Sequence, residues 1–314
     1  MLSAYLLVSH GSSDPRHKAG LLRLANMMRQ QLDRSRREDS QTPLMTKQQA
    51  SAPFNHDRTH LTHPALAESS DSRSAQSIRP PYRVALPPIP VVGTATLEVT
   101  HIPLARQIEV FARRVMAQGV RRVVIVPLFL LAGVHVQEDL PREIATAQSL
   151  LPSRVQLLCT PYLGSYSGFK DFVGARLAAT TTDRCLLLSH GSRRPAGNRG
   201  VQQLGTTVDA DVAFWAVPPD LETKIVELMQ QGYQHIAIAP YFLFPGGITD
   251  AITRRTEDLA ERLPKLSLRL LTPLGTSTNL GKVVAELALN GVLSAPVQSG
   301  GRDLWQIAES GVTA

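Results

Sequence analysis

The segment Leu6-Leu-Val-Ser-His-Gly-Ser12 occurs again, with one residue changed, as Leu186-Leu-Leu-Ser-His-Gly-Ser192. Two further blocks repeat downstream of it in the same order. Residues 123–133 match residues 236–246, and residues 160–164 match residues 272–275 with one residue fewer. Because three matched blocks keep their order along the chain, the sequence indicates a duplicated unit.

Each copy alternates short runs of Val, Ile and Leu with longer amphipathic stretches. This alternation is typical of parallel strands that are covered on both faces by helices. Residues 107–116, for example, place apolar side chains at helical spacing. We therefore predict an α/β fold of two lobes, each a four-stranded parallel sheet flanked by helices. The predicted strands are 4–9, 91–97, 123–128 and 155–160 in the first copy, and 185–189, 212–215, 235–239 and 268–271 in the second.

Residues 34–90 of the first copy have no counterpart in the second. They are dense in Ser, Thr, Gln, Pro and charge, and they show no sustained hydrophobic period. We therefore expect a disordered insertion on the surface. The two lobes are then expected at residues 1–180 and 181–293, with a Gly/Ser-rich tail at 294–314.

A small histidine cluster, His56, His60 and His63, lies inside this insertion. A histidine-rich tract can hold metal weakly. Three histidines in a polar loop are more often incidental, and incidental placement is the favoured interpretation here.

The composition bounds the class of protein. The longest apolar stretch, residues 123–134, contains a proline and is shorter than the roughly 20 residues that a membrane helix needs. No basic residue precedes the first apolar run, so we expect no secretory leader. Cys159 and Cys185 show no paired spacing and are expected to be core thiols in a reducing compartment. We predict a soluble, cytoplasmic protein.

The formal charge of +7 and the pI of about 9.7 favour an acidic partner, or simply indicate a basic solvated surface. Nucleic acid, an anionic membrane and a small polyanion are all possible on charge alone. Aromatic residues make up only 5% of the chain and do not alternate with basic residues. This absence of stacking platforms argues against nucleic acid.

Three metal-binding side chains follow successive predicted strands. His10 comes directly after the first strand, Glu98 after the second, and His135 a short turn after the third. Ligands of parallel α/β sheets bind beyond the carboxyl ends of the strands, so we expect these side chains to converge. Two imidazoles and a carboxylate suit Fe²⁺, Co²⁺, Ni²⁺ or Zn²⁺. Each residue taken alone could instead be structural.

The second copy serves as an internal control for this interpretation. It keeps His190, but Ala216 and Ile248 take the places of the carboxylate and the second histidine. The surrounding strand and glycine pattern is retained, so the fold does not require the three side chains. We predict that the first copy is active and the second structural.

Residues after His10 and before His135 are candidate ligand contacts. Ser12, Ser13 and Arg16 lie where a helix is expected to begin, and free N–H groups and hydroxyls there favour anions. Simple capping of that helix by Ser or Asp is an equal alternative. Gly133 would let the backbone pass close to a flat ligand, or it is a plain turn glycine.

The motifs Ser9-His10-Gly11-Ser12, Glu98 and Pro127-Leu-Phe-Leu-Leu-Ala-Gly-Val-His135 together resemble the sirohydrochlorin chelatases, which are single-subunit class II chelatases. The resemblance covers both copies but not the insertion or the tail. It implies ATP-independent insertion of a divalent metal into sirohydrochlorin, Fe²⁺ toward siroheme being favoured and Co²⁺ toward cobalamin the alternative. It also implies a monomer whose two lobes face each other across a cleft, with the active histidines in one lobe.

The resemblance also implies what each site residue does. His10, His135 and Glu98 would bind the metal substrate, with Glu98 accepting a proton or completing the ligand set. Ser12, Ser13, Arg16 and nearby basic residues would meet the ring carboxylates. No tightly bound cofactor, nucleic acid or membrane is implied, and no G-x-x-x-x-G-K-[ST] run predicts a nucleotide site.

Three other classes of function compete with this one. A metal or tetrapyrrole carrier would bind the macrocycle without accelerating metal insertion. A serine hydrolase using Ser12 beside His10 lacks a G-x-S-x-G elbow. A nucleotide-binding module is disfavoured because neither first-strand turn has G-x-G-x-x-G.

Overall fold

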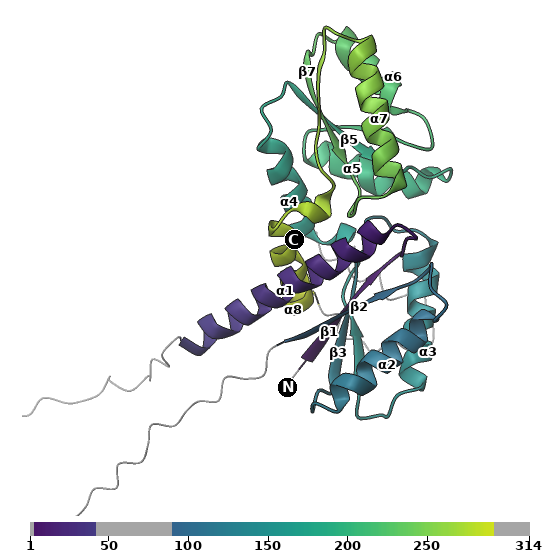
Figure 1. Ribbon diagram of the computed structural model, residues 1–314, viewed down its shortest axis with the longest axis vertical. Coiled ribbons are helices and arrows are strands. Elements are labelled where there is room, and N and C mark those ends of the chain that lie inside the picture. Colours follow the sequence, from purple (N-terminus) through teal and green to yellow (C-terminus); the bar gives the residue numbers. More distant parts are fainter. Residues whose placement is uncertain (1–2, 42–89, 292–314) are drawn as a thin grey trace, which may run out of the picture.

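The computed structural model describes residues 3–41 and 90–291, which form two α/β lobes (Figure 1). The histidine cluster of the insertion and the tail lie outside the described residues. Each lobe has a four-stranded parallel sheet, ordered β2-β1-β3-β4 in the first and β6-β5-β7-β8 in the second. The strands are β1 (Ser3–Ser9), β2 (Val91–Thr96), β3 (Arg122–Pro127), β4 (Gln156–Cys159), β5 (Arg184–Ser189), β6 (Asp211–Phe214), β7 (His235–Pro240) and β8 (Ser267–Leu270).

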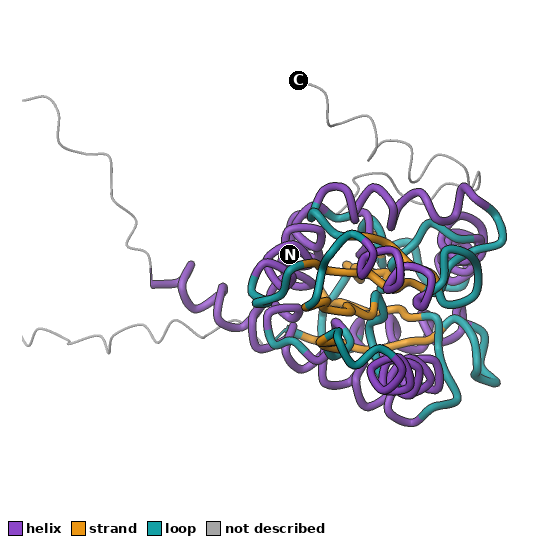
Figure 2. The backbone as a smooth tube through the Cα atoms, turned by 90° about the horizontal axis from the view of Figure 1, so that it is seen from above, coloured by secondary structure: helices purple, strands orange, loops and turns teal. Residues whose placement is uncertain are grey.

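Helices cover both faces of these sheets, as Figure 2 shows for the strands in orange and the helices in purple. The predicted fold class is therefore confirmed, and each predicted strand overlaps an observed one to within about one residue at either end. The α-helices are α1 (Pro15–Gln41), α2 (Leu104–Met116), α3 (Leu140–Ser149), α4 (Ser167–Ala178), α5 (Arg199–Thr207), α6 (Leu221–Gln230), α7 (Gly247–Arg262) and α8 (Asn279–Asn290).

Strand β1 is the central element of the first lobe. It is hydrogen-bonded to β2 on one side and to β3 on the other, so that Leu6 lies between Gly93 and Ile125. Its side chains alternate between two cores, because Leu7 packs with one hydrophobic cluster and Leu6 with another. A strand buried on both faces explains why this segment is a continuous apolar run.

The last helix of each copy packs in part against the other copy. Helix α8, from the second copy, lies against α1 and β3 of the first (Figure 1). Helix α4, from the first copy, lies beside the second lobe, where a Cβ at Gly174 would be 3.3 Å from Val208 Cγ1. We call α4 and α8 the exchanged helices, because each packs in part against the other copy. One apolar cluster consequently contains Leu7 of β1, Leu187 of β5 and residues of both exchanged helices. The two lobes therefore share a core.

Helix α1 continues through Gln41, beyond residue 34 where we expected the insertion to begin. Local side-chain bonds support this extra length. Asp33 and Arg37 form an ion pair at 2.9 Å one helical turn apart, and the Ser35 hydroxyl donates to the carbonyl of Gln31 at 3.2 Å. An ion pair one turn apart stabilises an exposed helix surface.

The two thiols fit the expectation of core cysteines only in part. Cys159 is buried, and burial raises the pKa of its thiol, whereas Cys185 is only partly buried. Neither forms a disulfide. None of the described helices is both long and apolar enough to span a lipid bilayer.

We predict that Gly281→Ala destabilises the protein by about 1–3 kcal/mol, because overpacking a tight helix contact has that cost. A Cβ at Gly281 of α8 would lie 2.6 Å from Met27 Cβ of α1. Urea unfolding measures the change. The control is Gly200→Ala in α5, where a Cβ would meet nothing within 4 Å. Equal stability of both variants would show that α1 and α8 are not packed as described.

Candidate metal centre

His10, Glu98 and His135 come together at the carboxyl edge of the first sheet. Glu98 Oε2 lies 3.7 Å from His10 Nε2, and Glu98 Oε1 lies 3.6 Å from His135 Nε2. The two imidazole rings are edge to face, with centroids 4.7 Å apart. One ligand atom from each residue lies within 4.8 Å of the other two. The side chains of His10, Glu98 and His135 are 49%, 47% and 33% exposed, so the cluster is open to solvent.

The pairing of β1 with β2 continues past both strands and fixes His10 beside Glu98. The N–H of Leu97 donates to the carbonyl of Ser9 at 2.9 Å, and the N–H of Glu98 donates to the carbonyl of His10 at 2.8 Å. Gly11 follows with φ +104°, where a Cβ would lie 2.2 Å from the Glu98 carbonyl oxygen. Glycine alone permits both this φ and this close approach.

His135 begins a single π-helical turn, His135–Asp139, that precedes α3. Such turns are rare and often lie at functional sites. Within this turn His135 Nδ1 lies 2.8 Å from Asp139 Oδ2, and Arg142 holds the other carboxylate oxygen at 3.0 Å. Because an ionised carboxylate only accepts, Nδ1 is the protonated nitrogen. The lone pair of Nε2 is then directed at the cluster, which is how outer partners orient metal-ligating histidines.

Asp139 is thus a site residue that the sequence analysis missed. Its signal in the sequence was the four-residue spacing from His135, which places both side chains on one helical face. His17 of α1 was also missed. Burial lowers its pKa and the nearby charge of His10 lowers it further, which favours a neutral ring packed edge to face on Phe244.

The residue after Glu98 has a strained backbone. Val99 has φ +56°, a left-handed conformation that β-branched residues rarely adopt. Its side chain is exposed, as are those of Ile102 and Val134 in the loops next to the cluster. Outliers of this kind cluster at ligand-binding sites.

The second copy reproduces the backbone of this site but keeps only one of its three ligand residues, His190. The N–H of Ala216 donates to the carbonyl of His190 at 2.9 Å, as Glu98 does to His10. Ile248 stands as far beyond β7 as His135 stands beyond β3. Among the described residues, a metal-ligand cluster of this kind occurs only in the first copy.

Ser12, Ser13 and Arg16 lie in the loop and first helical turn after His10, as expected. The Ser12 hydroxyl accepts the N–H of Asp14 at 3.1 Å, and the Asp14 carboxylate accepts the N–H of Arg16 at 2.9 Å. Asp14 therefore caps α1. Ser13 is exposed, and its hydroxyl forms no hydrogen bond within the described residues.

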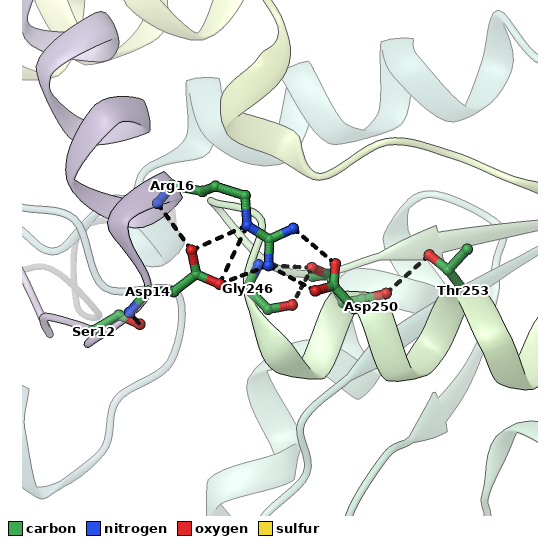
Figure 3. Close-up of polar contacts among 7 residues, drawn as sticks. Ser12, Asp14, Arg16, Gly246, Asp250 and Thr253 are labelled. Carbon is green, nitrogen blue, oxygen red and sulfur yellow. Dashed lines mark hydrogen bonds and ion pairs between the residues drawn. The ribbon is translucent and has the colours of Figure 1, made fainter.

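The guanidinium of Arg16 is bound to two carboxylates rather than free (Figure 3). It donates to Asp14 at 2.6–3.2 Å and, across the lobes, to both oxygens of Asp250 at 2.6 and 3.0 Å. These bonds lower the pKa of Asp14 from 3.8 to about 2 and lower the pKa of Asp250. Arg16 thus joins the first lobe to the start of α7, which the sequence analysis did not anticipate.

Gly133 lies at the start of the helix that contains His135. Its carbonyl accepts the N–H groups of Val136 and Gln137 at 3.0 and 3.1 Å. A Cβ there would meet nothing within 4 Å. The fold itself therefore does not demand glycine at this position.

Comparison with known proteins gives the family of the chain. The CbiX family model matches twice, over residues 69–180 and 184–290, which together are well over half of the chain. Glu98 and His135 lie inside the first match, whereas His10 precedes it. A sirohydrochlorin ferrochelatase of Priestia megaterium is 28% identical over 156 residues, covering 46% of this chain and 58% of that protein.

Two solved structures share the fold over nearly the whole chain. SirB from Bacillus subtilis with Fe³⁺ has a TM-score of 0.59 at 20% identity, covering 92% of this chain and 97% of the other. A SirB structure from Bacillus subtilis subspecies spizizenii in complex with cobalt has a TM-score of 0.56 at 20% identity, with the same coverage. At this identity the likeness shows the fold alone.

We predict that Asp250→Asn destabilises the protein at neutral pH but not in strong acid. Pairing with Arg16 lowers the pKa values of Asp14 and Asp250 in the folded state. The pairing therefore contributes its full stability at a pH above the ordinary carboxyl pKa of 3.8. It is lost as the pH falls through the folded values, about 2 for Asp14. Thermal unfolding measured from pH 7 to pH 2 should show that the difference in Tm between wild type and variant shrinks as the pH falls.

The matched control for this measurement is Asp171→Asn, at an exposed position of α4. It should track the wild type throughout. A Tm difference between wild type and Asp250→Asn that stays constant with pH would contradict the ion pair.

Proposed function

The chain belongs to the CbiX family, and from this premise we propose that it inserts a divalent metal ion into sirohydrochlorin. The observation that supports the proposal most directly is the cluster of His10, Glu98 and His135. The sirohydrochlorin ferrochelatase of Priestia megaterium, matched over part of its length, supports the choice of macrocycle.

The two carboxylate–imidazole distances within the cluster suit one metal ion. Two atoms bound to the same ion at about 2.1 Å each lie at most about 4.2 Å apart. The two separations from Glu98 to the histidine Nε2 atoms, 3.7 and 3.6 Å, fall inside that limit. His10 and His135 then act as neutral imidazole ligands and Glu98 as the anionic one.

Transfer of the ion requires that the site be open and that protons leave the ring. Three protein ligands leave a coordination position free, as in catalytic rather than structural sites. Two pyrrole N–H protons are released for each divalent ion that enters the macrocycle. Glu98, freed as the ion moves to the ring nitrogens, accepts one of them, and an imidazole or solvent takes the other. The exposed Val99, Ile102 and Val134 offer apolar contacts to the face of the ring.

We propose Fe²⁺ as the principal metal substrate and Co²⁺ as the alternative. The ligand set suits both ions. The name of the Priestia megaterium relative favours iron, and the SirB structures with Fe³⁺ and with cobalt are consistent with either. We further propose that no nucleotide takes part. Ser12, Ser13 and Gly133 line the approach to the ring, and Arg16 positions that loop through its bonds to Asp14 and Asp250.

We expect His10→Ala and His135→Ala each to lower the rate of metal insertion by more than about 100-fold, because each removes a ligand to the ion. His190→Ala, the matched control in the second copy, should stay within about twofold of the wild type. The measurement is an anaerobic absorbance time course with sirohydrochlorin and Fe²⁺ or Co²⁺.

Two results of this time course would overturn the proposal. Equal losses of insertion rate from His10→Ala and His190→Ala would show that we have assigned the active site to the wrong lobe. A wild type that binds sirohydrochlorin without accelerating metal insertion would make the protein a carrier instead.

We predict that Asp139→Asn weakens metal binding by about 10–100-fold, the usual effect of removing the outer partner of a metal-ligating histidine. The bond to Asp139 sets which nitrogen of His135 has the proton. Titration of the metal alone, followed by a competing chelator, measures the affinity. Glu138→Gln, one residue earlier and exposed, should bind normally. If both variants bind like the wild type, Asp139 does not orient His135.

A further inference from the structure

The loop after the first strand of each copy has the same backbone turn and opposite charge. In the first copy the Ser12 hydroxyl accepts the N–H of Asp14, and in the second the Ser192 hydroxyl accepts the N–H of Arg194, both at 3.1 Å. Ser13 and Asp14 are thereby replaced at equivalent positions by Arg193 and Arg194. Both copies therefore have the serine turn, but they differ in the side chains that follow it.

The arrangement of the lobes is approximately twofold. Arg176 of α4 donates to the hydroxyl of Thr272, which follows β8, and Gly291 at the end of α8 lies against Pro161, which follows β4. The carboxyl edges also meet directly, because the Tyr241 hydroxyl after β7 donates to the carbonyl of Leu130 after β3 at 3.5 Å. Each copy therefore contacts the other through corresponding elements.

From this relation we infer that the second copy's loop lies opposite the turn that contains His135. The first copy's loop reaches the start of α7, where Arg16 binds Asp250. The corresponding pair on the other side is Ala196 and Gln137, which form no ion pair. Among the described residues, an ion pair thus joins the lobes at the first copy's loop, and no ion pair is formed at the corresponding place beside the turn that contains His135.

Arg193 and Arg194 are exposed, and neither guanidinium has a hydrogen bond or ion pair within residues 3–41 and 90–291. Arg16, by contrast, is bound by two carboxylates. The second copy also has Ala216 and Ile248 in place of metal ligands. Its carboxyl edge therefore has two cationic side chains and, among the described residues, keeps only His190 of the three ligand positions.

We propose that Arg193 and Arg194 bind carboxylate groups of the tetrapyrrole, so that one copy handles the metal and the other anchors the macrocycle. The inference rests on the proposed function. Guanidinium groups pair with carboxylates through two parallel hydrogen bonds, which fixes orientation as well as charge. Two adjacent arginines can hold neighbouring carboxylates on the rim of the ring and leave its nitrogens facing the cluster of the first copy.

The test compares wild type with the double variant R193Q/R194Q by absorbance titration of metal-free sirohydrochlorin. We expect the Kd to rise about tenfold or more, because charge-assisted hydrogen bonds are lost. In metal insertion, KM should rise to the same extent while kcat at saturation stays within about twofold, since uniform binding is removed. R193K/R194K should recover part of the affinity. Circular dichroism and the Tm should match the wild type.

Two controls separate specific pairing from general charge. Arg199→Gln removes an equally exposed charge from the start of α5 and should leave binding unchanged. The methyl ester of sirohydrochlorin, which lacks free carboxylates, should bind wild type and R193Q/R194Q alike. Equal weakening by Arg199→Gln, or equal binding of sirohydrochlorin by wild type and R193Q/R194Q, would overturn the inference.

Failure of the inference and failure of the proposed function give different results. If the wild type inserts metal and R193Q/R194Q binds sirohydrochlorin normally, only the role of the two arginines is overturned. If the wild type binds sirohydrochlorin through the arginines but inserts no metal, only the proposed function is overturned.

Discussion

Strand β1 is hydrogen-bonded on both sides, and the geometry of the metal centre depends on that. Because β1 lies between β2 and β3 in register, its end can present His10 between Glu98 and His135. The left-handed Gly11 then lets the chain turn away without pushing Glu98 aside. A side chain at this glycine would separate the two strand ends, and the imidazole and carboxylate with them.

The strands and the convergence of the three ligands could be predicted from the sequence because both follow from local pattern and from the rule for parallel sheets. The partner of Arg16 could not, since Asp250 lies 234 residues away in the other lobe. The four-residue spacing of His135 and Asp139 was a signal in the sequence, but the π-helical turn in which the two side chains meet was not predicted. The exchange of α4 and α8 was equally hidden, because an amphipathic helix does not specify which sheet its apolar face will cover.

Duplication explains how one half could lose its ligands without losing its fold. The bonds that shape the site are backbone bonds, and Ala216 donates to His190 as Glu98 donates to His10. The side chains at these positions are exposed, so replacing them leaves no buried group unpaired. The charge of the carboxyl edge can therefore differ between the copies, and it does so at Arg193 and Arg194.

The Arg16 ion pair and the burial of apolar side chains both connect the lobes, and they differ in how much stability they contribute. An exposed ion pair contributes little to stability, because water and salt screen it, whereas burying one leucine-sized side chain contributes about 1.5–3 kcal/mol. Both α4 and α8 place several fully or nearly fully buried side chains in the shared core. The exchanged helices, and not Arg16, hence hold the lobes together. What the pairing of Arg16 with Asp14 and Asp250 determines is the position of the loop after His10. The lobes accordingly need no charge at Arg193 or Arg194 for docking, and those two side chains remain available for a ligand.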